Sequence, residues 1–448
     1  MALLEASGPA NVTEGVPPAR QTMPVDRVFW SHFSPNLGPG GWVSGVLLVH
    51  LGLGPLTGIA AILVGNILGA LPVALAAVIG PRTGLTQMEA SRRVLGDRGL
   101  RLPSLLNWIY CVGWDAVNNV PAAAALGSLL LLFGVPMPFW AALGVLALCQ
   151  MAASIYGHDL VQGLQKFLGG PLLLAFIGIG VLSVARGGFG ANYAPQASWP
   201  NIVLATAVIA SFNLSWVSYS SDYTRYLPAS TPPAHIIRLA LAGLLCSSAP
   251  FQILGLLTAG SLGEGSPLGV IDALRDQAGW LGWAVLAVIA LSSITGNSVN
   301  DNTAAYSLIS AGLRLPRTIA ALLTAALGYV LAVAGAGSYA DFYARYLVLT
   351  MYWIAPWSAL VLADWYLRPP ASLHTDARAD RAWTLGASIF VVTTIATIAL
   401  FASSEVYTGP VARLLGGADI GYYVGFASAF LAYAWLAPRH DPSLSVTP

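Results

Sequence analysis

Two long apolar segments of this chain are each interrupted near the middle by residues that do not continue an apolar helix. The first segment, residues 29–53, contains Ser-Pro-Asn-Leu-Gly-Pro-Gly-Gly at positions 34–41. The second, residues 202–226, contains Ser-Phe-Asn-Leu-Ser-Trp at positions 211–216. A helix in lipid must satisfy its backbone groups internally, so an interruption is tolerated only where it lines a cavity or a binding site. Interrupted helices at matching places in two halves are typical of secondary transporters and indicate where the substrate binds.

Composition predicts a chain that lies mostly in lipid. Hydrophobic residues make up 56% and charged residues 9% of the 448 positions, whereas a soluble domain carries roughly 25% charged residues. The net charge of +1 provides no basic surface for nucleic acid. A membrane-spanning helix needs roughly 20 apolar residues. Twelve segments meet this requirement, at residues 28–53, 55–79, 104–133, 137–156, 159–185, 201–226, 235–262, 279–311, 316–337, 339–367, 382–403 and 420–437.

The arginines indicate the orientation of these spans. Fifteen arginines lie in the two terminal segments or in loops after even-numbered spans, and three lie in loops on the opposite side. The positive-inside rule therefore predicts that both termini are cytoplasmic, in a multi-pass protein of the cell (inner or plasma) membrane. The expected organisation is a cytoplasmic tail (1–26), a transport core (27–367), a cytoplasmic linker (368–381), two further helices (382–437) and a second cytoplasmic tail (438–448).

The two interrupted segments are spans 1 and 6, which lie five spans apart. This offset predicts a five-plus-five inverted repeat, with halves at about 27–186 and 199–367, followed by spans 11 and 12. The expected fold class is therefore an all-α integral membrane protein with twelve transmembrane helices.

Span 3 carries an aromatic residue and an amide on one face. Trp114 and Asn118 are four residues apart, so their side chains point to the same side of a helix. An indole that stacks and an amide that bonds to a ring edge would suit a flat heteroaromatic ligand. The alternative is a tryptophan packed in the bundle and an asparagine that bridges helices.

Span 8 is polar in its middle, where residues 292–303 read Ser-Ser-Ile-Thr-Gly-Asn-Ser-Val-Asn-Asp-Asn-Thr. A carboxylate such as Asp301 is costly inside a membrane and usually faces a cavity where it has a function. The alternative is a hydrated network between helices. Hydroxyl oxygens of span 8 and freed carbonyls of span 1 could form a sodium cage. His32, just before the first interruption, could carry a proton or be a neutral, hydrogen-bonded histidine.

Six motifs in order along spans 1–10 resemble the nucleobase:cation symporter family, the permeases for cytosine, purines, uracil, thiamine, allantoin and hydantoins. They are Phe33–Leu37, Gly80–Leu85 with Gln87-Met88 and Ser91-Arg92, Gly113-Trp114 with Asn118, Asp222–Pro228, Asn300–Asn302, and Tyr352–Trp357 running into Ala363–Arg368. The resemblance implies a leucine-transporter-like fold. It also implies that the substrate is contacted by Phe33, Ser34, Trp114, Asn118, Ser211, Phe212 and Asn300, with Trp216 as a further aromatic contact.

The resemblance implies a sodium site as well. Its ligands would come from the region of Phe29 and His32 on span 1 and from Thr295 and Ser298 on span 8. Sodium-coupled members carry two adjacent hydroxyl residues where this chain has Ser298-Val299, so the cage is one side-chain oxygen short. In a proton-coupled protein, Asp301 or His32 would serve instead.

The expected function is import of a nucleobase, cytosine or a purine-like heterocycle, with Na⁺ or H⁺ by alternating access. The nearest alternative keeps the fold and changes the substrate to allantoin, a hydantoin or a pyrimidine vitamin precursor. A channel or a substrate sensor is the alternative from another class. We expect no enzymatic activity, since Asp301 lacks a metal-ligand cluster or nucleophile–base spacing around it. We expect no cofactor beyond the coupling ion, no nucleic-acid partner and no obligate protein partner.

Overall fold

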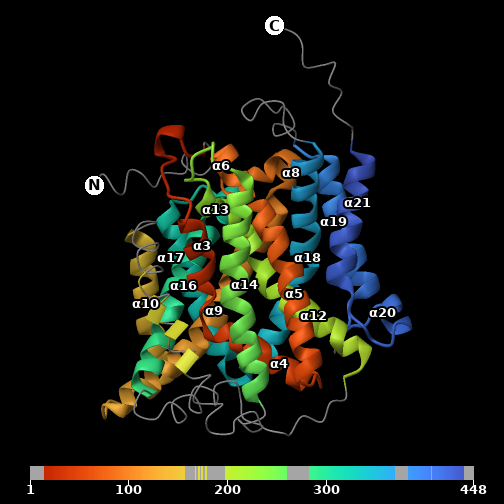
Figure 1. The fold of residues 1–448 in the computed structure, drawn as a ribbon. Coiled ribbons are helices and arrows are strands. Elements are labelled where there is room, and N and C mark those ends of the chain that lie inside the picture. Colours follow the sequence, from red (N-terminus) through yellow and green to blue (C-terminus); the bar gives the residue numbers. More distant parts are fainter. Residues whose placement is uncertain are drawn as a thin grey trace.

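The fold is helical throughout the described ranges of a computed structural model, which cover residues 15–156, 197–259, 282–368 and 382–437, apart from position 405 and with single residues between 157 and 196. The one extended pairing among them is an isolated bridge between Ser403 and Thr408. Seven described helices are long and apolar enough to cross a membrane. Most run side by side along one direction, and the first and last described helices, α3 and α21, reach the same end of the bundle (Figure 1).

The first predicted interruption is present. Helix α3 (Arg27–Phe33) passes into a short 3₁₀ turn, η2 (Ser34–Asn36), before α4 (Pro39–His50) begins. Gly38 between them is extended, with φ −144° and ψ 171°. Pro39 stands at the first position of α4, where proline removes no helical hydrogen bond.

The second interruption is built differently. Helix α12 (Trp199–Leu214) continues into a five-residue 3₁₀ stretch, η3 (Ser215–Tyr219), and then into α13 (Ser220–Thr224). Ser215 Oγ donates to the Phe212 carbonyl at 2.6 Å. Such bonds from serine to the preceding turn compete with helical pairing and support a local change of winding. The helix therefore tightens at this point instead of opening into an extended linker.

The remaining helices agree with the predicted spans. Of the twelve segments, eleven coincide with described helices, and the fifth (159–185) lies outside the described residues except at single positions. Besides the elements named above, and including short ones outside the predicted spans, the described helices are η1 (Pro18–Arg20), α5 (Pro55–Ala76), α6 (Ile79–Thr83), α7 (Gln87–Ala90), α8 (Arg92–Gly99), α9 (Arg101–Leu132), α10 (Phe139–Tyr156), α14 (Pro233–Thr258), α16 (Gly282–Ser310), α17 (Arg317–Gly335), η6 (Ala336–Ser338), α18 (Tyr339–Leu367), α19 (Leu385–Phe401), α20 (Pro410–Leu414) and α21 (Gly421–Leu436).

The described helices pack as two sets of four. In the first set, α4 and α5 contact each other and each contacts both α12 and α14, and α9, α10, α16 and α17 form the second set. Spans 1–4 of the first predicted half would correspond to spans 6–9 of the second. Accordingly, α4 of span 1 packs on α14 of span 7, and α12 of span 6 packs on α5 of span 2. In the same way, α9 of span 3 packs on α17 of span 9, and α16 of span 8 packs on α10 of span 4. Two equivalent halves related by an inverted repeat would pack in this way.

Glycines allow the first set to pack closely. A Cβ added at Gly69 of α5 would lie 2.1 Å from the Ala210 carbonyl oxygen of α12. A Cβ at Gly255 of α14 would lie 2.0 Å from the Trp42 carbonyl oxygen of α4. Small residues at such crossings let two backbones approach each other, which is how membrane helices gain packing energy.

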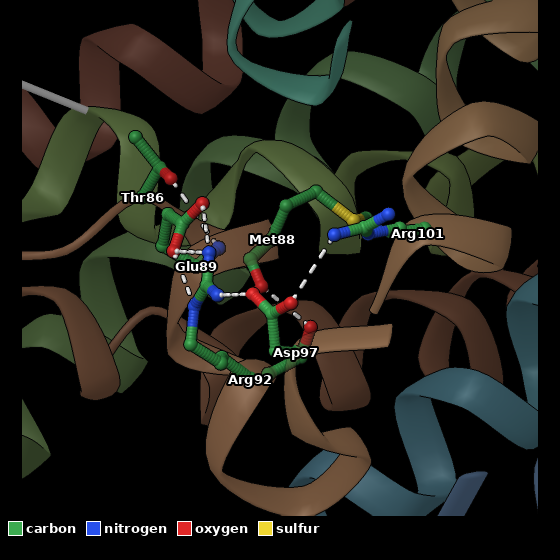
Figure 2. A network of polar contacts seen from close by, with 7 residues as sticks. Thr86, Met88, Glu89, Arg92, Asp97 and Arg101 are labelled. Carbon is green, nitrogen blue, oxygen red and sulfur yellow. Dashed lines mark hydrogen bonds and ion pairs between the residues drawn. The ribbon is translucent and has the colours of Figure 1, made fainter. Parts of the chain in front are cut away.

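Short helices α6, α7 and α8 link α5 to α9 and carry a charged network, which Figure 2 shows. Arg92 bonds to Glu89 through Nε at 3.0 Å and also pairs with Asp97. Arg101, at the start of α9, reaches the other Asp97 oxygen at 3.3 Å. Thr86 accepts a hydrogen bond from the Glu89 amide and caps α7. The network joins α7, α8 and α9 and holds the loop in one conformation.

The described part of the predicted N-terminal tail packs on the helical core. Gln21 is buried, and its Nε2 donates to the Pro81 and Arg225 carbonyls, each at 3.0 Å. The Met23 amide donates to the Tyr226 carbonyl at 2.9 Å. Residues 15–26 therefore connect the end of span 2 to the end of span 6.

Candidate substrate site

A cavity lies where the two interrupted helices meet α9 and α16. The empty space within it and at its mouth, open solvent included, is about 470 Å³. Its walls come from η2 and the start of α4, from α9, from α12 and η3, and from α16. The lining residues are Pro35, Asn36, Gly38, Gly40, Gly41, Trp114, Asn118, Phe212, Ser215, Trp216, Tyr219, Gly296 and Asn300. The interruptions therefore lie at the cavity, as the sequence predicts.

Aromatic side chains form much of the wall. Trp114 on α9 and Phe212 on α12 stand with ring centroids 6.0 Å apart and planes at 76°. Trp216 on η3 packs beside Tyr219, with centroids 5.1 Å apart. Trp114 is also held edge-to-face by Tyr346, at 5.5 Å. Flat faces presented from three elements suit stacking with a flat ring.

Hydrogen-bond donors without partners are buried at the same place. Asn36 Oδ1 accepts from Trp216 Nε1 at 2.6 Å, whereas Asn36 Nδ2 has no hydrogen-bond partner among the described residues. Trp114 Nε1 is likewise buried without one. Because an unmade hydrogen bond of a buried group costs about 1–3 kcal/mol, these donors favour a ligand that brings ring-edge acceptors.

The side-chain amides of two asparagines that line the cavity already form hydrogen bonds with residues behind its wall. Asn118 Nδ2 donates to Asn297 Oδ1 at 2.8 Å. Asn300 Nδ2 donates to the Cys111 carbonyl at 2.5 Å and to Asp115 Oδ1 at 2.7 Å. Asn300 Oδ1 accepts from the Tyr219 hydroxyl. These amides tie the cavity wall to a polar layer between α9 and α16.

Of the eight residues predicted to contact substrate, five line the cavity: Trp114, Asn118, Phe212, Trp216 and Asn300. The structure places the other three, Phe33, Ser34 and Ser211, outside its lining. Ser211 Oγ donates to the Leu347 carbonyl of α18 at 3.0 Å. Phe33 stacks on Phe29 with centroids 5.0 Å apart, and Ser34 Oγ is buried without a partner among the described residues. Ser211 thus faces α18, which the motif alone could not show.

Several lining residues were absent from the sequence prediction, chiefly Asn36, Ser215 and Tyr219. Asn36 carried a usable signal, because a polar side chain within a helix interruption is expected to face the site. Tyr219 lies three residues after Trp216 and so shares its side of the tightened helix. Ser215 could not be placed without knowing that η3 winds as a 3₁₀ helix.

Three of the four predicted sodium ligands, Phe29, His32 and Ser298, have described side chains. Ser298 Oγ donates to the Ile294 carbonyl at 2.5 Å, and the side chain of Thr295 lies outside the described residues. The Phe29 carbonyl faces Gly243 of α14, where an added Cβ would meet it at 2.7 Å. His32 Nδ1 is 2.8 Å from the Val28 carbonyl. Sodium binding at these positions stays a prediction.

Val299, which takes the place of the second hydroxyl residue, is fully buried in the hydrophobic core. Among the described residues no group of three or more His, Cys, Asp or Glu is arranged to hold a metal ion.

The end of span 6 is fastened to α16 and α7. Asp222 Oδ2 accepts from Thr303 Oγ1 at 2.6 Å, and Asp222 Oδ1 accepts from the Gln87 amide at 2.9 Å. The guanidinium of Arg225 lies over the Tyr306 ring, 5.0 Å from its centroid. These contacts join the first helix set to the second at the end of the molecule where the chain enters α3. We call the contacts of Asp222 and Arg225 with α16 the span 6 latch.

Comparisons with known proteins agree with this geometry. Residues 16–425 match the family described as permease for cytosine/purines, uracil, thiamine, allantoin. A Bacillus subtilis protein assigned as a purine-cytosine permease is 27% identical over 413 residues, with 89% of each chain covered. The purine-cytosine permease fcyB of Emericella nidulans is 26% identical, covering 95% of this chain and 87% of that protein.

A solved structure has the same fold. It is Mhp1, a nucleobase-cation-symport-1 family transporter in a closed conformation with bromovinylhydantoin bound. The TM-score is 0.75 at 16% identity, covering 95% of this chain and 94% of that one. The predicted all-helical, leucine-transporter-like membrane fold is therefore confirmed, together with a multi-pass membrane location and a non-enzymatic role, while the count of twelve spans and the inverted repeat stay predictions. The chain belongs to the family of permeases for cytosine and purines, uracil, thiamine and allantoin.

Proposed function

We propose that this permease imports a nucleobase-like heterocycle together with a cation across the cell membrane, with both termini in the cytoplasm. One observation carries the substrate proposal. The cavity between the two interrupted helices combines aromatic faces with buried donors that lack partners. The relatives named above as purine-cytosine permeases support the same class of substrate.

The bound ring would stack against Trp114 or Trp216, and Asn36 Nδ2 would donate to a carbonyl or nitrogen at its edge. Cytosine and purines offer both a flat face and such acceptors. A hydantoin or allantoin has carbonyl acceptors and no aromatic face, so it would use the asparagine and gain less from the indoles. The ratio of affinities for cytosine and allantoin therefore reports how much of the binding is stacking.

Alternating access would follow from the two helix sets. Each set is packed within itself, and the cavity lies between them. Rocking one set against the other would open the cavity to one side at a time. Moving one positive charge inward across 100 mV supplies about 2.3 kcal/mol, which is roughly a 50-fold concentration ratio. One coupled cation would therefore suffice to scavenge a dilute substrate.

The test is a binding screen on purified protein against nucleobases, hydantoins, allantoin and pyrimidine vitamin precursors, with sodium or choline at fixed pH. Asn36→Ala should weaken binding of the preferred ligand roughly 2- to 12-fold, the effect of one hydrogen bond of about 0.5–1.5 kcal/mol. Ser211→Ala is the matched control, because its hydroxyl bonds to α18. Equal loss in both variants would place the ligand outside this cavity. No binding of any of these ligands would refute the proposed substrate class.

A further inference from the structure

The substrate site does not use two buried carboxyl groups that lie behind it. Asp115 on α9 and Asp301 on α16 are both fully buried. Gln150 Nε2 of α10 donates to Asp115 Oδ2 at 3.1 Å and to Asp301 Oδ2 at 2.9 Å. One nitrogen atom thus bonds to both carboxyl groups, so they are immediate neighbours. Sequence reasoning named Asp301 alone and did not single out Asp115.

Within the described residues, neither aspartate forms an ion pair with lysine, arginine or histidine. The titratable side chains that interact with the pair include Cys111 on α9 and Tyr346 on α18. Tyr219 on η3 bonds to Asn300, which donates to Asp115. The polar groups that α10 directs at the pair, from Gln150 and Ser154, do not titrate. Helix α17 contributes Gly328, where an added Cβ would lie 2.5 Å from the Asp115 Cβ. Two negative charges placed side by side without a cation would be very costly.

The hydrogen bonds show which carboxyl oxygen of the pair lacks a donor. Asp115 accepts from Asn300 and Gln150, one donor on each oxygen. Asp301 Oδ2 accepts from Gln150 and from Ser154 Oγ at 2.9 Å. Asp301 Oδ1 is buried and has no donor. Among the described residues it is the one buried carboxylate oxygen without a hydrogen-bond partner. By contrast, the buried carboxyl group of Asp419 has a donor on each oxygen.

We infer that Asp115 and Asp301 form a proton site that holds one proton shared between the two carboxyl groups, and that this proton is the coupling ion of the permease. Only the statement that this proton is the coupling ion rests on the proposed function. A single proton removes one of the two negative charges and lets one carboxyl group donate a hydrogen bond to the other. It needs no further ligand, which fits a tightly packed layer.

Two hydrogen-bond chains connect this proton site to the substrate cavity. The first runs from Tyr219 through Asn300 to Asp115. The second runs from Asn118 through Asn297 Nδ2 to Gln150 Oε1 at 3.2 Å. Tyr219, Asn300 and Asn118 line the cavity. A ligand that reorients these side chains changes the donors offered to the carboxyl pair. Proton and substrate would then alter each other's affinity by the same factor, as linkage requires.

The first experiment needs no substrate. Infrared spectra of the reconstituted protein should contain the C=O stretch of a protonated carboxyl group that Asp301→Asn removes. Asp419→Asn is the control, since Asp419 is a buried carboxyl group between α20 and α21 that bonds to Tyr352 of α18, and neither residue lines the cavity. A band that Asp301→Asn leaves unchanged would overturn the inference, whether or not the protein transports a nucleobase.

The second experiment tests coupling in proteoliposomes free of sodium. An inward proton gradient should drive accumulation of the preferred nucleobase by the wild type and by Asp419→Asn. Asp301→Asn should lose accumulation at least tenfold and keep exchange against internal substrate, which needs no net proton movement. Asp115→Asn gives the same test if Asp301→Asn does not fold. Accumulation that is retained in both would overturn the inference. So would wild-type accumulation that ignores the proton gradient and appears only in a parallel set of proteoliposomes with an inward sodium gradient. Absence of all nucleobase transport by the wild type would instead refute the proposed function.

Discussion

The span 6 latch offers a direct test of alternating access, through the substitution Thr303→Val. This change keeps the shape of the side chain and removes the hydroxyl that donates to Asp222 at 2.6 Å. Both residues are buried, at 1% and 4% exposure. The bond joins α13 to α16, so it exists only while the two helix sets touch at this end. Its loss should therefore favour the conformation that is open there.

The size of the effect follows from the type of bond. A hydrogen bond to a charged group contributes about 1.5–3 kcal/mol. Its loss should shift the equilibrium between closed and open states roughly 10- to 150-fold. Asp222 keeps its second donor, the Gln87 amide, so the carboxylate is not left bare and the protein should remain folded. Thr324→Val is the matched control, because that buried threonine accepts from Trp108 within the second helix set.

The assay is a distance measurement between spin labels at two exposed positions, Ser230→Cys and Arg314→Cys. They follow span 6 and α16, on either side of the latch. The background replaces the exposed Cys149 and Cys246 with serine, while Cys111 is buried. Thr303→Val should move population from the short to the long distance, and Thr324→Val should not. An unchanged distribution in a folded Thr303→Val protein would refute the latch, and equal shifts in both variants would indicate general loosening.

Three further predictions follow from the packing. Asn300→Ala should abolish uptake while Asn302→Ala retains it, because two residues along a helix differ by about 200° and only the first lines the cavity; equal loss in radiolabelled uptake would contradict this. Trp114→Ala should weaken nucleobase binding roughly 5- to 150-fold, about 1–3 kcal/mol of stacking, and also lower thermal stability, since the indole packs against other rings. Trp114→Phe should keep part of both, and normal binding by the alanine variant would refute the stacking role. Gly69→Ala should cost about 1–3 kcal/mol or more, because its Cβ would collide with α12, whereas Gly144→Ala meets only an ordinary contact at 3.8 Å; similar melting temperatures would contradict the close approach.

The sequence by itself determined the positions and nature of the spans. Long apolar runs must be helical in lipid, so their limits are readable to within a few residues. Pro35, Gly38 and Pro39 together disfavour a continuous helix, and the structure interrupts the chain between α3 and α4 there. Helical spacing also placed Trp114 and Asn118 on one face, and both line the cavity. These outcomes depend on local chemistry, which a sequence carries in full.

Only the tertiary structure decided which partner each polar side chain meets. Ser211 lies in the second motif and yet bonds to α18, while Asn36, one residue from a proline, holds Trp216 across 180 positions. Asp115 and Asp301 become neighbours because α9, α10 and α16 pack together. Gly328 marks the close approach of α17 to the same layer. The rotation and separation of packed helices determine these side-chain contacts. Both arise from the packing of the whole bundle, which no single segment encodes.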